Sequence, residues 1–147
     1  MRSSRIIAVD FDGTLCENKY PNIGEPNDLL LGYLKHCREK YSDKLILWTC
    51  RVGEKLDEAI EWCILHGLIF DTVNENLPEI IKKFGGDNRK IYADIYLDDK
   101  SIRPKELTVD AEFFIEEKIF KIDPKRDSSD FLNITIDIDK EKKNVFT

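Results

Sequence analysis

Short apolar runs that end at polar or acidic residues recur along the first hundred residues of the chain. Four of these runs are predicted to form strands: residues 6–9, 44–49, 68–73 and 91–97. Continuous apolar runs of this length are typical of strands that are covered on both faces in a parallel sheet. The first run leads directly into Asp10-Phe11-Asp12-Gly13, and the Asp-Gly turn favours a strand over a buried helix segment.

Apolar residues recur at helical spacing between the predicted strands. The predicted helices cover residues 28–40, 53–66 and 78–84. Their buried faces should contain Leu30, Leu31, Leu34 and Cys37 in the first helix, and Leu56, Ile60, Cys63 and Ile64 in the second. Asn27 and Gly67 are candidate caps, and residues 16–26 are predicted to be a loop with a short hairpin around Tyr20-Pro21. Strands and helices in alternation predict an α/β fold with a mostly parallel sheet.

Composition and charge narrow the class of protein. A length of 147 residues suits one domain with a short appendage, and a net charge of −6 gives no basic surface for nucleic acid or an anionic membrane. No stretch approaches the roughly twenty apolar residues of a membrane helix, so we expect a cytoplasmic protein. The four cysteines are irregularly spaced, which favours reduced thiols over disulfides or a zinc site: Cys16, Cys37, Cys50 and Cys63.

Residues with candidate site chemistry follow three of the predicted strands. Ligands of open parallel α/β sheets bind outside the carboxyl ends of the strands, and this rule brings together Asp10, Asp12, Thr49, Asp98 and Asp99. In extended backbone Asp10 and Asp12 point to the same side, and crowded carboxylates favour a divalent cation or a raised pKa. The alternatives are structural: an Asx turn at Asp10 to Gly13, a turn cap at Thr49, and a solvated loop at Asp98-Asp99.

The segment Asp10-Phe11-Asp12-Gly13-Thr14-Leu15 resembles the first motif of the haloacid dehalogenase (HAD) superfamily of phosphohydrolases. The resemblance extends over residues 5 to about 103 and is to the small capless type, with some similarity to deoxyribonucleotidase-like and polynucleotide-phosphatase-like members. It implies a Rossmann-like three-layer fold with a mostly parallel sheet. Both places where a cap domain is inserted in relatives are filled by predicted helices and strands, so no cap is expected. The predicted division is a core over residues 1–103 and a C-terminal α+β extension over residues 104–147.

The resemblance also implies a role for each motif residue. Asp10 would attack phosphorus to form an aspartyl-phosphate, and Asp12 would be the general acid and then the general base. Phosphoryl oxygens would bind the Thr49 hydroxyl, the Cys50 N–H and the amides of the turn from Phe11 to Gly13. Mg²⁺ would be held by Asp10, by the backbone carbonyl of Asp12, and by Asp98 or Asp99, with the direct ligand of the last two left open.

The superfamily's third motif supplies a lysine, and this chain has Asn74-Glu75-Asn76 where that lysine usually stands. We assign the role to Lys90, because similar relatives carry a lysine shortly before an Ala-Asp-x-x-x-Asp-Asp stretch. If residues 91–97 formed one straight strand, Lys90 would lie more than about 20 Å from Asp98, so this role requires a bend. The alternatives are Lys82, Lys83 and Lys100.

These residues together predict a Mg²⁺-dependent phosphomonoester hydrolase, acting on a nucleotide or on a nucleic-acid terminal phosphate. A low-activity HAD-fold binding or regulatory protein is the first alternative, supported by the absence of lysine near Asn76. A phosphotransferase, which would pass the phosphoryl group to an acceptor other than water, is the second. The physiological substrate is not encoded in the motifs.

The C-terminal extension has apolar residues to bury. Residues 113–122 form an apolar cluster, residues 123–130 a loop, and residues 131–138 alternate like a strand with one buried face. An alternating strand needs a partner edge, so we expect it to join the sheet edge or to pair with its copy in a second subunit as a homo-oligomer.

Overall fold

The computed structural model describes residues 2–107, and the chain divides into two compact units, residues 1–99 and residues 100–147. The first unit carries the sheet and its helices. In the second unit the described residues contain one short 3-10 helix, Pro104–Glu106. The predictions for residues 113–138, a cluster, a loop and a strand, lie outside the described residues.

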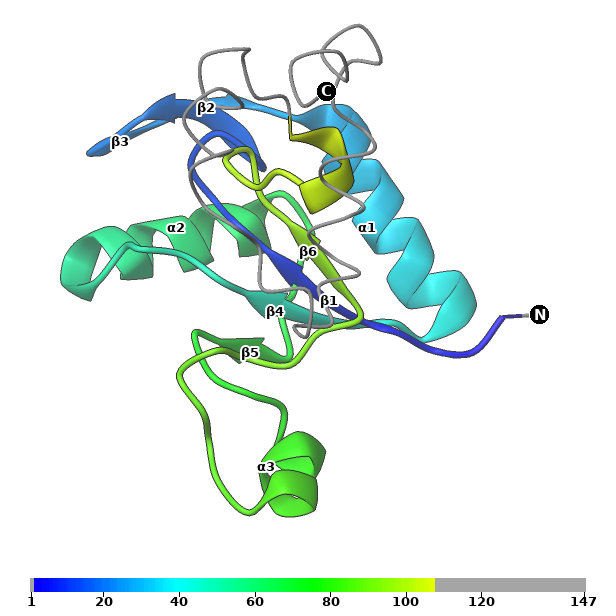
Figure 1. Ribbon diagram of the computed structural model, residues 1–147. Coiled ribbons are helices and arrows are strands. Elements are labelled where there is room, and N and C mark those ends of the chain that lie inside the picture. The colour runs from blue at the N-terminus through cyan, green and yellow to red at the C-terminus, as the bar shows by residue number, and fades with distance from the viewer. Residues whose placement is uncertain (1, 108–147) are drawn as a thin grey trace, which may run out of the picture. The chain divides into compact units, whose positions relative to one another are not determined.

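The centre of the first unit is a four-stranded parallel sheet (Figure 1). Its strands are β1 (Ile6–Val9), β4 (Lys44–Leu47), β5 (Thr72–Val73) and β6 (Ile95–Leu97), in the order β5-β4-β1-β6. In the central strand, Ile7 is in register with Leu45 on one side and Ile95 on the other. All three strand pairs are parallel, which confirms the predicted α/β fold with a mostly parallel sheet.

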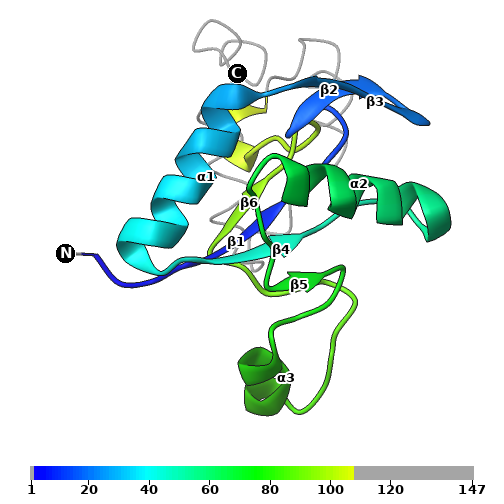
Figure 2. The ribbon, with the colours of Figure 1, turned by 180° about the vertical axis from the view of Figure 1, so that it is seen from behind.

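Helices cover the two faces of this sheet (Figures 1 and 2). Side chains alternate along each strand, so Ile7 and Val9 pack in one core cluster with Leu34 of α1 (Asp28–Tyr41) and Cys63 of α2 (Gly53–Leu65). Ala8 points to the opposite face and packs in a second cluster. That cluster contains Ile46, Ile80 of α3 (Pro78–Phe84), Ile91 and Ala93. The result is a three-layer arrangement in which β1 is buried on both sides.

A β-hairpin follows β1 and leads into α1. Strands β2 (Cys16–Lys19) and β3 (Asn22–Pro26) are antiparallel, and the turn between them contains a cis Tyr20-Pro21 bond. The hairpin predicted around Tyr20-Pro21 is therefore confirmed, although it occupies most of the segment that the sequence indicated to be a loop. Leu15 and Cys16 are buried at its base, whereas Tyr20 is exposed at its tip.

The helix ends follow the predicted capping residues. The side chain of Asn27 accepts a hydrogen bond from the Leu30 N–H at 3.2 Å and caps α1, as predicted. Gly67 has a φ of +77° and follows the end of α2. The predicted burial of Ile64 is wrong, since this side chain is 55% exposed. The buried stripe of α2 contains Ala59 and Cys63 instead, and Ile64 is about 100° further round the helix than Cys63.

Two predicted strands are shorter than their apolar runs. The strand predicted over residues 68–73 is reduced to β5, because the Leu68 N–H bonds to the Cys63 carbonyl and continues the end of α2. The strand predicted over residues 91–97 is reduced to β6. Ile91 and Ala93 are buried in the α3 cluster, and the Tyr96 hydroxyl donates to the Ile91 carbonyl, so the chain bends before β6.

Carboxylates also stand near the amino ends of the strands, where they serve the fold. Asp43 accepts hydrogen bonds from the Arg5 N–H and from the Arg2 guanidinium, and Asp71 accepts from the Leu45 N–H. The Asp94 carboxylate accepts from the Ile6 N–H at 2.7 Å. These contacts satisfy backbone donors at the edge of the sheet opposite to the predicted site. In residues 2–107 no helix is both long and apolar enough to cross a lipid bilayer.

Candidate active site

The candidate site lies at the carboxyl edge of the sheet, between β1 and β6. Asp10 follows β1 directly, and Asp98 and Asp99 follow β6. The Asp10 N–H donates to the Leu97 carbonyl at 2.9 Å, so these two strand ends are held side by side. The helix α1, which follows β1 in the chain, covers one face of the sheet, and α3, which precedes β6, covers the other. The point between the ends of β1 and β6 is therefore a topological switch point, the place where open α/β sheets bind ligands.

Three carboxylates converge at this point. One oxygen from each of Asp10, Asp98 and Asp99 lies within 4.8 Å of the other two. Asp10 and Asp98 are half-buried and Asp99 is exposed. Carboxylate oxygens are the ligands that Mg²⁺ prefers, and a divalent cation would offset the repulsion among three like charges. The three residues that the sequence placed on one rim are therefore brought together, and their oxygens fit a magnesium or similar cation.

The environment of Asp10 disfavours its charged form. The pKa of Asp10 is raised from 3.8 to about 6 by all of its surroundings together, and burial is the largest cause. The backbone hydrogen bond from Phe11 lowers this pKa, whereas the nearby Asp98 and Asp99 carboxylates contribute to its rise. A cation between these groups would reverse the effect, because it favours the ionised carboxylate.

Thr14 and Gly13 fix the two sides of the cluster. The Thr14 hydroxyl donates to Asp10 Oδ2 at 3.3 Å and accepts from the Asp99 N–H at 3.1 Å, so it joins the two strand ends. Gly13 has a φ of +83°, and a Cβ at this position would lie 2.4 Å from Asp99 Oδ2. Thr14 belongs to the quoted motif but received no role from the sequence. A hydroxyl four residues after Asp10, beyond a glycine turn, was the available signal.

Thr49 stands at the same edge, one strand away. The Trp48 N–H donates to the Val9 carbonyl at 2.8 Å, which extends the β4 pairing to the end of β1. The Thr49 N–H donates to Asn74 Oδ1 at 2.8 Å, and the Thr49 hydroxyl accepts from the Arg51 N–H at 3.1 Å. Asn74 directly follows β5 and has a φ of +54°. Through this side chain, which sequence analysis had not selected, the end of β5 also contributes to the edge.

Asp12 is not one of the three clustered carboxylates, and its carboxylate pairs with Arg51. Arg51 Nε donates to Asp12 Oδ2 and Arg51 Nη2 donates to Asp12 Oδ1, both at 2.8 Å. Arg51 is 2% exposed, and the hydrogen bonds to Asp12 raise its pKa. Sequence analysis did not find this residue. A buried arginine needs a carboxylate partner, but its choice among 29 acidic residues depends on the tertiary fold.

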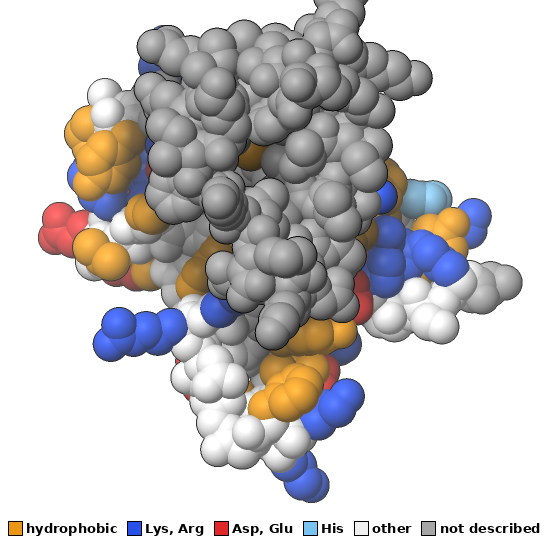
Figure 3. Space-filling model, in the orientation of Figure 1, with side chains coloured by type: hydrophobic (Ala, Val, Ile, Leu, Met, Phe, Trp, Pro, Cys, Tyr) orange, Lys and Arg blue, Asp and Glu red, His pale blue; other side chains and the backbone are white. Residues whose placement is uncertain are grey.

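Lys90, the predicted lysine of the site, lies beside the ring of Tyr96. The Lys90 ammonium lies 5.8 Å from the centre of the Tyr96 ring, and neither a hydrogen bond nor an ion pair within residues 2–107 connects it to Asp10. The required bend before β6 is present. Lys82 and Lys83 are exposed on α3, and Lys and Arg side chains lie beside a hydrophobic part of the surface at the bottom of Figure 3. Lys100 belongs to the second unit.

The fold and the site define an α/β protein with a parallel sheet and an acidic cluster at its carboxyl edge. Among solved structures the chain is similar to a conserved protein from Bacteroides thetaiotaomicron. The two are 40% identical, the match covers 82% of this chain and 94% of the other, and the TM-score is 0.61. The chain belongs to the family of this conserved protein. No protein-family model matches the chain, and no curated protein matches it.

Proposed function

We propose that the protein is a Mg²⁺-dependent phosphomonoester hydrolase of the HAD type, acting through an aspartyl-phosphate. The observation that carries the proposal is the cluster of Asp10, Asp98 and Asp99 where β1 and β6 end. Three carboxylates would repel a phosphate dianion. A cation bound to the cluster would offset this repulsion and also the repulsion among the carboxylates themselves. The resemblance of Asp10 to Leu15 to the first HAD motif then assigns the chemistry.

Asp10, Asp98 and Asp99, with the backbone carbonyl of Asp12, would hold Mg²⁺. When bound, the cation would neutralise charge on the phosphoryl group and help to orient it. The protein's own groups would complete the site. The Thr49 hydroxyl accepts from the Arg51 N–H, so its proton is available to donate to a phosphoryl oxygen.

Asp10 would attack phosphorus with one carboxylate oxygen. The Thr14 hydroxyl binds Asp10 Oδ2, which leaves Oδ1 for the new bond to phosphorus. As the bond from phosphorus to the leaving oxygen breaks, Asp12 would give that oxygen a proton. Asp12 would then remove a proton from water, which attacks the aspartyl-phosphate, releases inorganic phosphate and restores Asp10.

Two other functions use the same residues. A binding or regulatory protein with slow turnover is favoured by one observation: Asn74, rather than a lysine, contacts Thr49 at the end of β5. A phosphotransferase would differ only in the acceptor of the phosphoryl group. The sequence resemblance favours a nucleotide or a nucleic-acid terminal phosphate as substrate.

The test is steady-state hydrolysis of p-nitrophenyl phosphate by the full chain, with Mg²⁺ and with a chelator. We expect turnover that requires the metal and that Asp10→Asn abolishes. Asp57→Asn is the matched control, because Asp57 is an exposed carboxylate on α2. Metal-independent turnover would refute the requirement for Mg²⁺. An Asp10→Asn variant that retains more than a few per cent of the rate would refute the covalent mechanism. A screen of phosphorylated metabolites and of 3′- and 5′-phosphorylated oligonucleotides would then identify the substrate, and product analysis would detect transfer to another acceptor.

A further inference from the structure

Arg51 connects three parts of the structure through one guanidinium group. Arginine has five N–H donors, and all five are used here. Two go to the Asp12 carboxylate, two go to the carbonyls of Pro21 at 3.2 Å and Asn22 at 2.9 Å, and one goes to the Lys55 carbonyl in α2 at 3.3 Å.

The guanidinium carbon also lies 5.0 Å from the centre of the Phe11 ring and 5.1 Å from that of the Tyr20 ring. A buried side chain with every donor satisfied in this way holds a single position.

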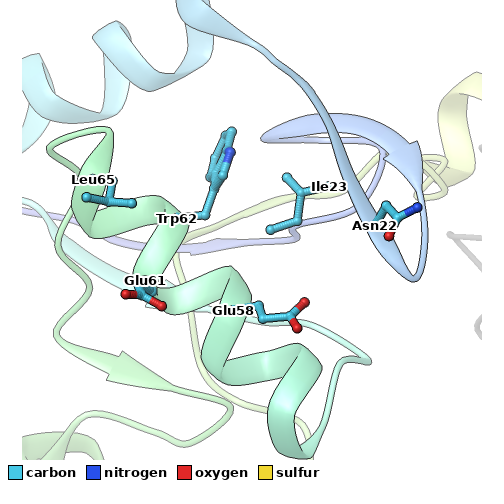
Figure 4. A pocket seen from close by; sticks show the side chains of 6 residues that line it. All are labelled: Asn22, Ile23, Glu58, Glu61, Trp62 and Leu65. Carbon is cyan, nitrogen blue, oxygen red and sulfur yellow. The ribbon is translucent and has the colours of Figure 1, made fainter.

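The hairpin tip depends on these contacts. The base of the hairpin is anchored in the core by Leu15 and Cys16, but Tyr20 at the tip is 60% exposed. On the α2 side, a hollow of about 340 Å³ separates Asn22 and Ile23 of the hairpin from the side chains of α2. Figure 4 shows the two hairpin residues across this hollow from Glu58, Glu61, Trp62 and Leu65. Ile23 packs partly against the core cluster, whereas the Arg51 guanidinium binds the turn itself through the carbonyls of Pro21 and Asn22.

We propose that Arg51 is a positioning residue that fixes the Asp12 carboxylate and the tip of the β2–β3 hairpin as one unit. A change at Asp12 then loosens the hairpin, and displacement of the hairpin reorients Asp12. Only the fork of an arginine can do this, because a lysine in its place would supply a single point charge with three donors. The mechanical part of this inference stands without any enzymatic activity. The catalytic part rests on the proposed function, in which Asp12 exchanges protons with the leaving oxygen and with water.

The mechanical part is tested by amide hydrogen exchange of residues 16–26 in the metal-free full-length protein. Arg51→Lys keeps the charge and removes the fork, and Asp12→Asn removes the partner while leaving Arg51 in place. We expect each variant to exchange its hairpin amides about tenfold faster or more, as expected for the loss of charge-assisted hydrogen bonds, with α1 unchanged. The double variant should be no faster than Arg51→Lys, because both changes break the same connection.

Arg38→Lys is the matched control. Arg38 forms a similar bidentate pair with Asp71, with distances of 2.7 and 3.3 Å, at the opposite edge of the sheet. Hairpin exchange in Arg51→Lys that equals exchange in Arg38→Lys would overturn the inference. So would effects of Arg51→Lys and Asp12→Asn that add in the double variant. Should Arg51→Lys not fold, Asp12→Asn against Arg38→Lys gives the same decision.

The catalytic part is tested by comparing two leaving groups. An alkyl phosphate such as glycerol phosphate needs a proton on its leaving oxygen, whereas p-nitrophenolate needs little help. Arg51→Lys should therefore reduce kcat at least tenfold more for the alkyl than for the aryl substrate, with little change in KM. Equal losses on both substrates would show that Arg51 does not act through Asp12. A wild-type protein without phosphatase activity would refute the proposed function, while the exchange rates would still decide whether Arg51 holds the hairpin.

Discussion

Replacing Asp10 by asparagine is expected to stabilise the metal-free protein while it removes activity. The pKa of Asp10 is raised from 3.8 to about 6 in the folded protein, chiefly by burial. Between these two values the folded state keeps a proton that the unfolded chain has lost, so stability falls as pH rises through this window. Above pH 6 the folded protein bears the full cost of an ionised carboxylate, and asparagine does not carry that charge.

The size of the effect follows from the pKa difference. Each pKa unit corresponds to 1.36 kcal/mol, so a shift from 3.8 to about 6 costs about 3 kcal/mol above pH 6. The variant should therefore be more stable than the wild type by up to about 3 kcal/mol at pH 7.5, and by about half as much at pH 5. For a chain of this length, 3 kcal/mol corresponds to an increase in Tm of roughly 10 °C.

The assay is urea unfolding with a chelator at pH 5, 6 and 7.5, with Asp57→Asn as the control. Saturating Mg²⁺ should then reduce or reverse the difference in stability between the variant and the wild type. A cation at a hundredfold excess over its Kd stabilises the wild type by about 2.7 kcal/mol, whereas the variant has lost a ligand for it. A variant no more stable than the control at pH 7.5, or a gain that does not change with pH, would refute this account of the cluster.

Three further predictions concern single residues. Gly13→Ala should cost roughly 1 to 3 kcal/mol in urea unfolding and at least a factor of ten in kcat, because Gly13 is in the left-handed region and its added Cβ would displace the Asp99 carboxylate. Lys90→Ala should slow turnover about tenfold if its ammonium reaches the phosphate, and unchanged steady-state kinetics would remove Lys90 from the site. Asp43→Asn should leave kcat unchanged and cost about 2 kcal/mol at pH 7, because the Arg2 hydrogen bonds lower the pKa of Asp43 from 3.8 to about 2. That difference should close as pH falls from 3.8 towards 2, where wild-type Asp43 becomes protonated; a constant difference would contradict it.

The positions of the helices and the hairpin could be predicted because their signals are local. Asn27 caps α1 through a side chain three residues away, and Tyr20-Pro21 turns the hairpin within its own segment. The ends of the strands could not be predicted in the same way. Ile91 and Ala93 continue the apolar run of β6, but they are buried against α3 instead of pairing with a strand. An apolar residue reports burial, and only the tertiary fold decides which element buries it.

The carboxylate cluster was predictable from a topological rule, since Asp10, Asp98 and Asp99 all follow strands of one parallel sheet. The contacts that organise the rest of the site were not. The pairs Asp12–Arg51 and Thr49–Asn74 join residues 39 and 25 positions apart through side chains, with no motif that relates them. Their partners depend on how the hairpin and the strand ends approach one another.

The pairing of β1 with β6 has a consequence for the order in which the chain is made. The Ile6 N–H and the Asp94 carboxylate are 88 positions apart, and Ile7 pairs with Ile95 across the same separation. At about 5 to 20 residues per second, a ribosome needs roughly 5 to 20 seconds between these two strands. During that interval Asp10 is present without Asp98 and Asp99, so a nascent chain lacks the repulsion among the three carboxylates and also lacks the cation site proposed for them. The strand β6 is the last strand of this unit to be made, and its arrival in the sheet completes the carboxylate cluster that is proposed to bind Mg²⁺.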